Sequence, residues 1–366
     1  MKFLHIADCH LSRPFGFLPP TLAEERRRDQ RRTLARAADL VIERDVDMLL
    51  IAGDLFDRPD PDPTDLEAVT EHLARITSTG RRVFAIPGNH DPCTRNSFWR
   101  RLDMPGLHLF LEPQCEHVII EDLGIAVAGC AFDRMQSERR AFDGLDLPRD
   151  VRCILLMHAS LESFEGQLER YHPFGLQELE RCGAAYVALG HYHRLNDFRA
   201  GSVTACYPGS LEGLSFDGPE TEGRHVVVAE IDEDGAVSIE PVKINMRTMR
   251  TAEIDCTSFE SSSALDDAIR RLCDPAALVQ LRLRGTPVQE LTASIDEIQA
   301  RFRESCHYIS VDTSGLSSPQ GIHLDSSIRG RFCRYLLEQI ESTPDAERQR
   351  LLRRALDLGL AALSDG

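Results

Sequence analysis

The chain has 366 residues, which is too long for one ordinary hydrophobic core, so two or three domains are expected. Apolar residues make up 42% and charged residues 28% of the chain, which is typical of a soluble globular protein. The formal net charge of −17 argues against broad, non-specific nucleic-acid binding, because such binding needs a basic surface. It does not exclude a local basic patch.

No apolar run reaches the roughly 18 residues that a membrane-spanning helix needs. The first residues become polar too early for a signal peptide, so we expect a cytoplasmic protein without a membrane anchor. The 11 cysteines are scattered and include no Cys-x-x-Cys pair, which argues against a cysteine zinc site and favours reduced, mostly buried thiols. An arginine cluster within 26–32 is interpreted as a solvated helix face, with a phosphate clamp as the alternative.

Short apolar runs alternate with helical patterns through the first two-thirds of the chain. The runs predict buried strands at 3–7, 48–52, 83–86, 125–130, 153–157, 185–189 and 226–231. Helical spacing of apolar residues occurs between them, at 34–42 and 66–76. The pattern predicts an α/β layer architecture over residues 1–245.

A smaller pattern follows. Strands are predicted at 251–256, 278–283 and 307–311, with helices between them, which indicates a small α+β domain over 246–318. Residues 319–366 contain the end of a Ser/Pro/Gly-rich linker and then two helices, which are separated by a break at Ser342-Thr343-Pro344. These helices are either a hairpin packed on its own domain, the interpretation that we favour, or a docking element for a partner helix.

Five short motifs each follow directly on a predicted strand, where open α/β sheets form ligand crevices. They are Asp8-Cys9-His10, Gly53-Asp54-Leu55-Phe56-Asp57, Gly88-Asn89-His90-Asp91, Leu156-Met157-His158-Ala159 and Gly190-His191-Tyr192-His193.

The spacing inside these motifs has a physical reading. In extended chain, alternate residues face the same side, so Asp8 and His10 would face the site while Cys9 turns away. His191 and His193 would do the same. A glycine stands just before a polar residue in three of the motifs, where it permits a tight turn or a close backbone approach.

The residue types predict a metal centre. Carboxylate, imidazole and amide oxygen suit Mn²⁺, Fe, Zn²⁺ or Ni²⁺ rather than a thiolate metal. Two cations about 3.5–4 Å apart usually share a carboxylate, and Asp54 is the candidate bridge. Taken singly, each residue has a plain structural interpretation: Asp8, Asp54 and Asn89 as turn residues, and His158 as a buried histidine. Together they predict seven metal ligands: Asp8, His10, Asp54, Asn89, His158, His191 and His193.

On these motifs the chain resembles the calcineurin-like metallophosphoesterases over roughly residues 1–215. The closer resemblance is to bacterial DNA-repair nuclease subunits of the SbcD type, and to their YhaO branch. It is carried by stretches such as His5 to Leu11, Tyr171-His172-Pro173-Phe174 and Tyr207 to Phe216. The resemblance implies a layered metallophosphoesterase sandwich of two central sheets flanked by helices, with a small α+β capping domain and a C-terminal helical hairpin.

The resemblance also implies roles. Asp8, His10, Asp54 and His193 would hold one cation, and Asp54, Asn89, His158 and His191 the other. His90 would be the catalytic imidazole, oriented by Asp91. The metals would be two divalent ions, with Mn²⁺ favoured.

A two-metal phosphodiesterase acting on DNA ends is therefore expected, in DNA repair or end processing. Its implied partner is an SbcC- or YhaN-like coiled-coil ATPase bound through the C-terminal helices. A homodimer through helices near 64–79 and 95–103 is also implied. One alternative is a small-molecule or nucleotide phosphodiesterase or phosphatase of the same superfamily. Another is a non-catalytic scaffold that keeps the fold.

Overall fold

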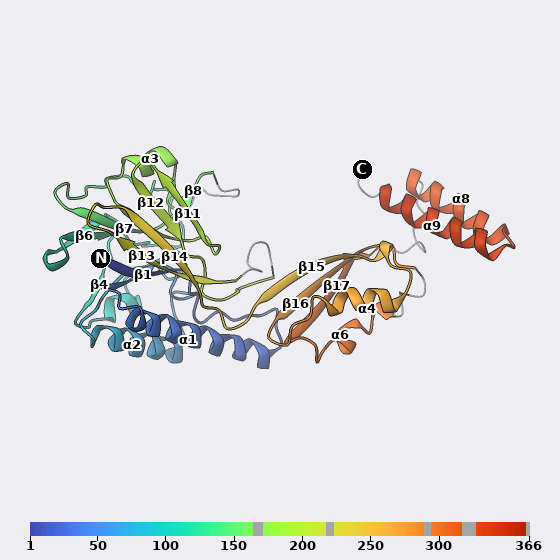
Figure 1. The fold of residues 1–366 in the computed structure, drawn as a ribbon, viewed down its shortest axis with the longest axis horizontal. Helices are drawn as coiled ribbons and strands as arrows, with labels where there is room; N and C mark the ends of the chain where they lie inside the picture. Colours follow the sequence, from blue (N-terminus) through green and yellow to red (C-terminus); the bar gives the residue numbers. More distant parts are fainter. Residues whose placement is uncertain (164–170, 217–222, 289–290, 292–293, 317–326, 364–366) are drawn as a thin grey trace. The chain divides into compact units, whose positions relative to one another are not determined.

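The structure is a computed structural model that describes residues 1–163, 171–216, 223–288, 291, 294–316 and 327–363. The chain divides into two compact units, Met1–Arg247 and Thr248–Gly366, which Figure 1 shows as a ribbon. None of the helices described is both long and apolar enough to span a bilayer.

The first unit is built on two sheets of six strands each (Figure 1). In spatial order, the first sheet contains β14 (Val237–Lys243), β13 (His225–Ile231), β1 (Lys2–Ile6), β2 (Met48–Ala52), β3 (Arg82–Ile86) and β4 (Leu107–Leu109). The second contains β11 (Asn196–Ala200), β12 (Val203–Tyr207), β10 (Tyr186–Gly190), β7 (Arg152–His158), β6 (Ile125–Gly129) and β5 (Glu116–Ile120). A short parallel pair joins β8 (Ser160–Leu161) to β9 (Pro173–Phe174).

Helices cover the outer faces of the two sheets. The helices of this unit are α1 (Pro20–Glu43), α2 (Pro63–Thr77) and α3 (Leu176–Arg181), with 3₁₀ turns η1 (Phe98–Arg101) and η2 (Glu121–Leu123). Both long helices begin at a proline, whose fixed φ suits the first helical turn.

Alternate residues of each strand serve different cores. On β1, Leu4 packs toward α1 and α2, whereas Phe3 packs into the layer between the two sheets. A third core, with Leu155 and Leu179, lies between the second sheet and α3. The strands are therefore buried on both faces, which is why they read as continuous apolar runs.

The second unit holds a three-stranded parallel sheet and a pair of helices. Consecutive strands run parallel because helical segments cross between them. Its elements are β15 (Met249–Asp255), η4 (Cys256–Ser258), α4 (Ser262–Arg270), β16 (Leu278–Gly285), α6 (Ile298–Arg301), β17 (Tyr308–Leu316), α8 (Ile328–Ser342) and α9 (Ala346–Ala362). The last two helices pack on each other through a small core of their own, with Leu336 and Leu356 at its centre.

The predicted α/β architecture of two sheets flanked by helices is confirmed, and every predicted strand is present. Two expectations were wrong in detail. Arg26, assigned to a solvated helix face, is 1% exposed. The helix implied near 95–103 is only the turn η1. The strands β4, β5, β8, β9, β11, β12 and β14 were not predicted; β5 and β14 carry exposed residues on much of their length, so their hydrophobic pattern is weak.

Candidate metal centre

The carboxyl ends of β1, β2 and β3 in one sheet meet those of β7 and β10 in the other. The two sheets come into contact where β2 and β7 end, since the ring Nδ1 of His158 lies 3.0 Å from the carbonyl oxygen of Ala52. This contact joins a residue of the second sheet to the last residue of β2 in the first. The polar residues that follow the five strands therefore come together at one edge.

The loop after β1 is not extended, contrary to the expectation from residue alternation. Asp8 and His10 have φ angles of 51° and 46°, and Asp54 in the next loop has 51°. Left-handed backbone is costly for residues other than glycine and is concentrated at functional sites. The side chains of Asp8 and His10 still face the same centre because the backbone turns twice, while Cys9 packs into the core toward the helices.

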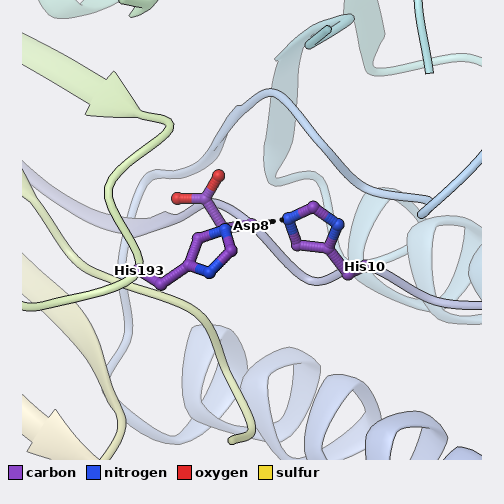
Figure 2. A group of neighbouring side chains, drawn as sticks. All are labelled: Asp8, His10 and His193. Carbon is purple, nitrogen blue, oxygen red and sulfur yellow. Dashed lines mark hydrogen bonds between the residues drawn. The ribbon is translucent and has the colours of Figure 1, made fainter. Parts of the chain in front are cut away.

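Asp8, His10 and His193 form one group of donor atoms, shown in Figure 2. The Nε2 atoms of His10 and His193 are only 3.1 Å apart. The opposite nitrogen of His10, Nδ1, lies 3.0 Å from Asp57 Oδ1. With its Nδ1 proton donated to a carboxylate, a neutral His10 presents the lone pair of Nε2 to this group.

A second group gathers around Asp54 and Asn89. The Oδ1 atom of Asn89 lies 3.0 Å from His158 Nε2 and 3.3 Å from His191 Nδ1. Asp54 Oδ2 lies 3.3 Å from His158 Nε2 and 3.6 Å from His10 Nε2. Asp54 therefore stands between the two groups, where a bridging ligand would have to be.

The structure gives His90 and Asp91 different surroundings from those expected. The Nδ1 atom of His90 lies 3.2 Å from the carbonyl oxygen of Asp57. The Asp91 carboxylate is buried and accepts hydrogen bonds from the backbone N–H groups of Phe56 and Gly88, at 3.0 and 2.8 Å. Among the contacts of the described residues, none joins the Asp91 carboxylate to the His90 ring, so the orienting group is the Asp57 carbonyl instead.

Burial and charge shift the ionisation of these groups in opposite directions. Burial alone would lower the pKa of His158, but the charges of Asp54 and Asp8 and hydrogen bonding raise it to about 9. Burial, followed by the charge of Asp54, raises the pKa of Asp91 to about 7. Burial, followed by the charge of His158, lowers the pKa of His191 to about 3. Such a concentration of perturbed groups is typical of a functional site.

Two residues near the centre were missed as site residues. Asp57 belongs to the second motif but was not predicted to be a site residue. Its carboxylate accepts hydrogen bonds from His10 Nδ1 and, at 2.8 Å, from Arg13 Nη1. Its position three residues after Asp54 was the only signal. Tyr171 places its ring 4.8 Å from that of His191, and no local pattern in the sequence announces this contact.

The residues present fit a divalent metal centre. The facing ring nitrogens of His10 and His193 and the buried carboxylates of Asp8 and Asp54 are lone-pair donors crowded around the same space. Desolvated donors of this kind are stable when they coordinate a cation. The set of carboxylate, amide and imidazole ligands contains no thiolate, which matches a borderline divalent ion.

Comparisons with known proteins agree with this geometry. The family model for calcineurin-like phosphoesterases matches residues 1–195. The DNA double-strand break repair protein Mre11 of Aeropyrum pernix is 31% identical over 290 residues, 74% of this chain and 68% of that protein. The uncharacterized metallophosphoesterase YhaO of Bacillus subtilis is 25% identical over 299 residues, 79% of this chain and 70% of that protein. One component of the B. subtilis nuclease SbcCD is 27% identical over 255 residues, 59% of this chain and 63% of that protein.

Proposed function

Because the chain belongs to the calcineurin-like phosphoesterases, and is therefore a metal-dependent hydrolase of phosphoester bonds, we propose that it is a two-metal DNA nuclease acting in DNA repair or end processing. The observation that carries the proposal is the convergence of donors from five strand ends around Asp54. DNA as the substrate is supported by the relatives, which are named as a DNA-break repair protein and a component of a nuclease.

The proposed centre holds two cations with Asp54 shared between them. Asp8, His10 and His193 complete one site, and Asn89, His158 and His191 complete the other. Divalent cations in such a centre activate water and neutralise charge on a phosphate. We propose Mn²⁺, while Fe, Zn²⁺ and Ni²⁺ suit the same donors.

The protein's own groups then divide the remaining work. His90 is the proposed catalytic imidazole and general acid: its Nδ1–H donates to the Asp57 carbonyl, and in the protonated ring Nε2–H gives its proton to the leaving oxygen. Asp54 Oδ1 accepts from the backbone N–H of His90 at 2.8 Å, which ties the position of this ring to the shared ligand. Asp91 shapes the turn that carries Asn89 and His90 by holding Gly88 and Phe56.

The metal-dependent chemistry is tested by hydrolysis of bis-p-nitrophenyl phosphate with and without Mn²⁺. Asp54→Ala should lower the rate by about 10²-fold or more, because both cations lose a shared ligand. Asp234→Ala, which removes an exposed carboxylate, should behave as wild type. Equal rates for wild type and Asp54→Ala would contradict the proposal.

The substrate is tested with defined single- and double-stranded DNA ends beside cyclic nucleotides and nucleotide pyrophosphates. The proposal expects DNA ends to be cleaved with the higher kcat/KM. Selective hydrolysis of the small molecules would instead assign a nucleotide phosphodiesterase. If the chain binds metal but hydrolyses none of these substrates, either alone or together with a coiled-coil ATPase partner, the remaining interpretation is a non-catalytic scaffold.

The helical pair is proposed to bind a coiled-coil ATPase of the SbcC type. Apolar residues seven positions apart are exposed on each helix: Ile328 and Tyr335 on α8 at 75% and 61%, and Leu351 and Leu358 on α9 at 67% and 54%. Spacing of seven residues is the repeat by which helices pack into coiled coils. A homodimer through the outer face of α2 is a further proposal, tested by light scattering of the purified chain.

A further inference from the structure

The loop that carries Asp8 and His10 has its backbone groups held from two sides. Its N–H groups donate toward the loop after β2: Asp8 N to Gly53 O at 3.1 Å, and His10 N to Asp54 O at 3.0 Å. The carbonyl groups of Cys9 and His10 point the other way, toward α1. Since left-handed φ angles at Asp8 and His10 are unfavourable by themselves, contacts from outside the loop must maintain them.

One side chain of α1 satisfies both carbonyl groups. Gln30 is 2% exposed, and its Nε2 donates to the carbonyl oxygens of Cys9 at 3.1 Å and His10 at 2.9 Å. Both partners are acceptors, so only the NH₂ end of the amide can face them. Within the described part of the chain, Gln30 Oε1 meets no donor. The amide is therefore held by the loop alone.

The helix that presents Gln30 is itself anchored by buried charges. Arg26, one turn before Gln30, pairs with Glu212 at 2.9 Å and with Asp29 at 3.2 Å. Thr33, three residues after Gln30, donates to Glu212 at 2.6 Å. All four groups are buried. A helix held in this way cannot rotate without breaking buried pairs, so Gln30 faces the loop from a fixed frame.

We infer that Gln30 is a positioning residue that keeps Asp8 and His10 in the geometry needed for one of the two metal sites. The inference rests on the proposed metal assignment. Gln30 touches neither ligand side chain; it acts through the carbonyls of Cys9 and His10. Asn89, His158 and His191, assigned to the other site, lie on segments that Gln30 does not contact among the described hydrogen bonds.

The consequence is an unequal effect on the two sites. Gln30→Leu keeps a side chain of similar size but removes both donors, which leaves two buried carbonyl groups unsatisfied and frees the loop to relax. The site of Asp8, His10 and His193 should then lose Mn²⁺ affinity by at least about tenfold, as expected for loss of an outer-shell contact. The second site should lose less affinity, because Asn89, His158 and His191 lie outside the loop that Gln30 holds.

The test is isothermal titration calorimetry of the full chain with Mn²⁺ as the only ligand, combined with metal analysis of the protein after gel filtration. Val41→Ala is the control, because it removes buried apolar packing from the same helix and touches neither the loop nor the buried pairs around Glu212. The inference expects two tightly bound ions for wild type and Val41→Ala, and for Gln30→Leu one tightly bound ion and a second that binds at least about tenfold more weakly. Gln30→Glu has the same shape but no N–H groups, and when ionised it has no donor at all, so it should weaken the same site. Circular dichroism of both Gln30 variants is the folding control.

Each result decides between stated alternatives. Two ions of wild-type affinity in Gln30→Leu would overturn the inference and leave the metal centre intact. The same loss in Val41→Ala would also overturn it, since general loosening of α1 would then be the cause. Failure of both Gln30 variants to fold would mean that the amide serves the fold instead. No bound ion in wild type would remove the proposed metal assignment itself.

Discussion

His10 divides its two ring nitrogens between separate tasks, and this division explains much of the centre. Nδ1 is committed to Asp57, and Nε2 faces His193. His158 does the same, with Nδ1 on the carbonyl of Ala52 and Nε2 toward Asp54 and Asn89. Each ring is thereby oriented by a group that is not a proposed ligand, which is how metal-binding histidines are usually held.

His90→Ala tests whether this residue acts on the substrate rather than on the metal. The variant should bind both Mn²⁺ ions as wild type does, and its kcat should fall by about 10²–10⁴-fold, the range for loss of a general acid. KM should change little. Metal analysis and steady-state kinetics on an activated phosphodiester check the two parts separately. Loss of a bound ion would make His90 a ligand.

His172 predicts a pH dependence of stability. It is 5% exposed, and its ring stacks on Phe132 at a centroid distance of 3.9 Å. Burial, followed by the charge of His158, lowers its pKa from 6.5 to about 4. Between these two pKa values, His172 is protonated in the unfolded chain and neutral in the folded chain. The stability that depends on neutral His172 is complete above pH 6.5 and is lost as pH falls toward 4.

His172→Phe keeps an aromatic ring against Phe132 and removes the titration. Between pH 7 and pH 4 the wild type should lose up to about 3 kcal/mol more of its unfolding free energy than the variant. Urea unfolding with a metal chelator present measures this difference. Parallel pH profiles for the two proteins would show that His172 is not the titrating group.

At the scale of elements, the centre depends on how closely two strands approach. Gly190 ends β10 and lies against the end of β2 in the other sheet: a Cβ atom there would come within 2.0 Å of the Ala52 carbonyl oxygen and 2.7 Å of His158 Nδ1. Gly88 is similar, since its Cβ would meet Asp54 Oδ1 at 2.2 Å. Glycine at these positions lets loops from both sheets reach a common site.

Gly190→Ala should accordingly destabilise the fold by about 1–3 kcal/mol, the usual cost of overpacking, and weaken Mn²⁺ binding by displacing His158. Gly16→Ala is the matched control, because a Cβ at Gly16 has no atom within 4 Å. Thermal unfolding and metal titration of both variants make the comparison. A Gly190→Ala protein indistinguishable from Gly16→Ala would contradict the close approach.

At the scale of the whole molecule, the two units have separate cores and separate proposed tasks. The donor atoms of the metal centre all belong to Met1–Arg247, and the exposed apolar residues of α8 and α9 belong to the second unit. Changes on the helical pair should therefore affect partner binding and leave the metal chemistry alone. The structure divides the chain into two units. The domain boundaries predicted near residues 245 and 318, which would give three domains, remain a prediction.

Tyr335→Glu combined with Leu351→Glu places charge at the centre of the exposed apolar positions. The double variant should lose co-elution with a coiled-coil ATPase of the SbcC type and keep wild-type hydrolysis of an activated phosphodiester. Gln114→Glu adds a negative charge at an exposed position of the first unit and should still bind. Partner binding by the double variant would show that another surface is used.

Local sequence determined most of the buried strands, the two long helices and the residue types at the strand ends, because buried strands and amphipathic helices have short-range hydrophobic periods. It also marked Asp8, Asp54 and His158 as polar residues following buried strands. Only the tertiary structure decided which of these atoms meet, because the contacts join residues up to 183 positions apart, as in His10 with His193. The left-handed turn at Asp8, the Asp57 contacts and the amide of Gln30 depend on such distant packing, which no local period encodes.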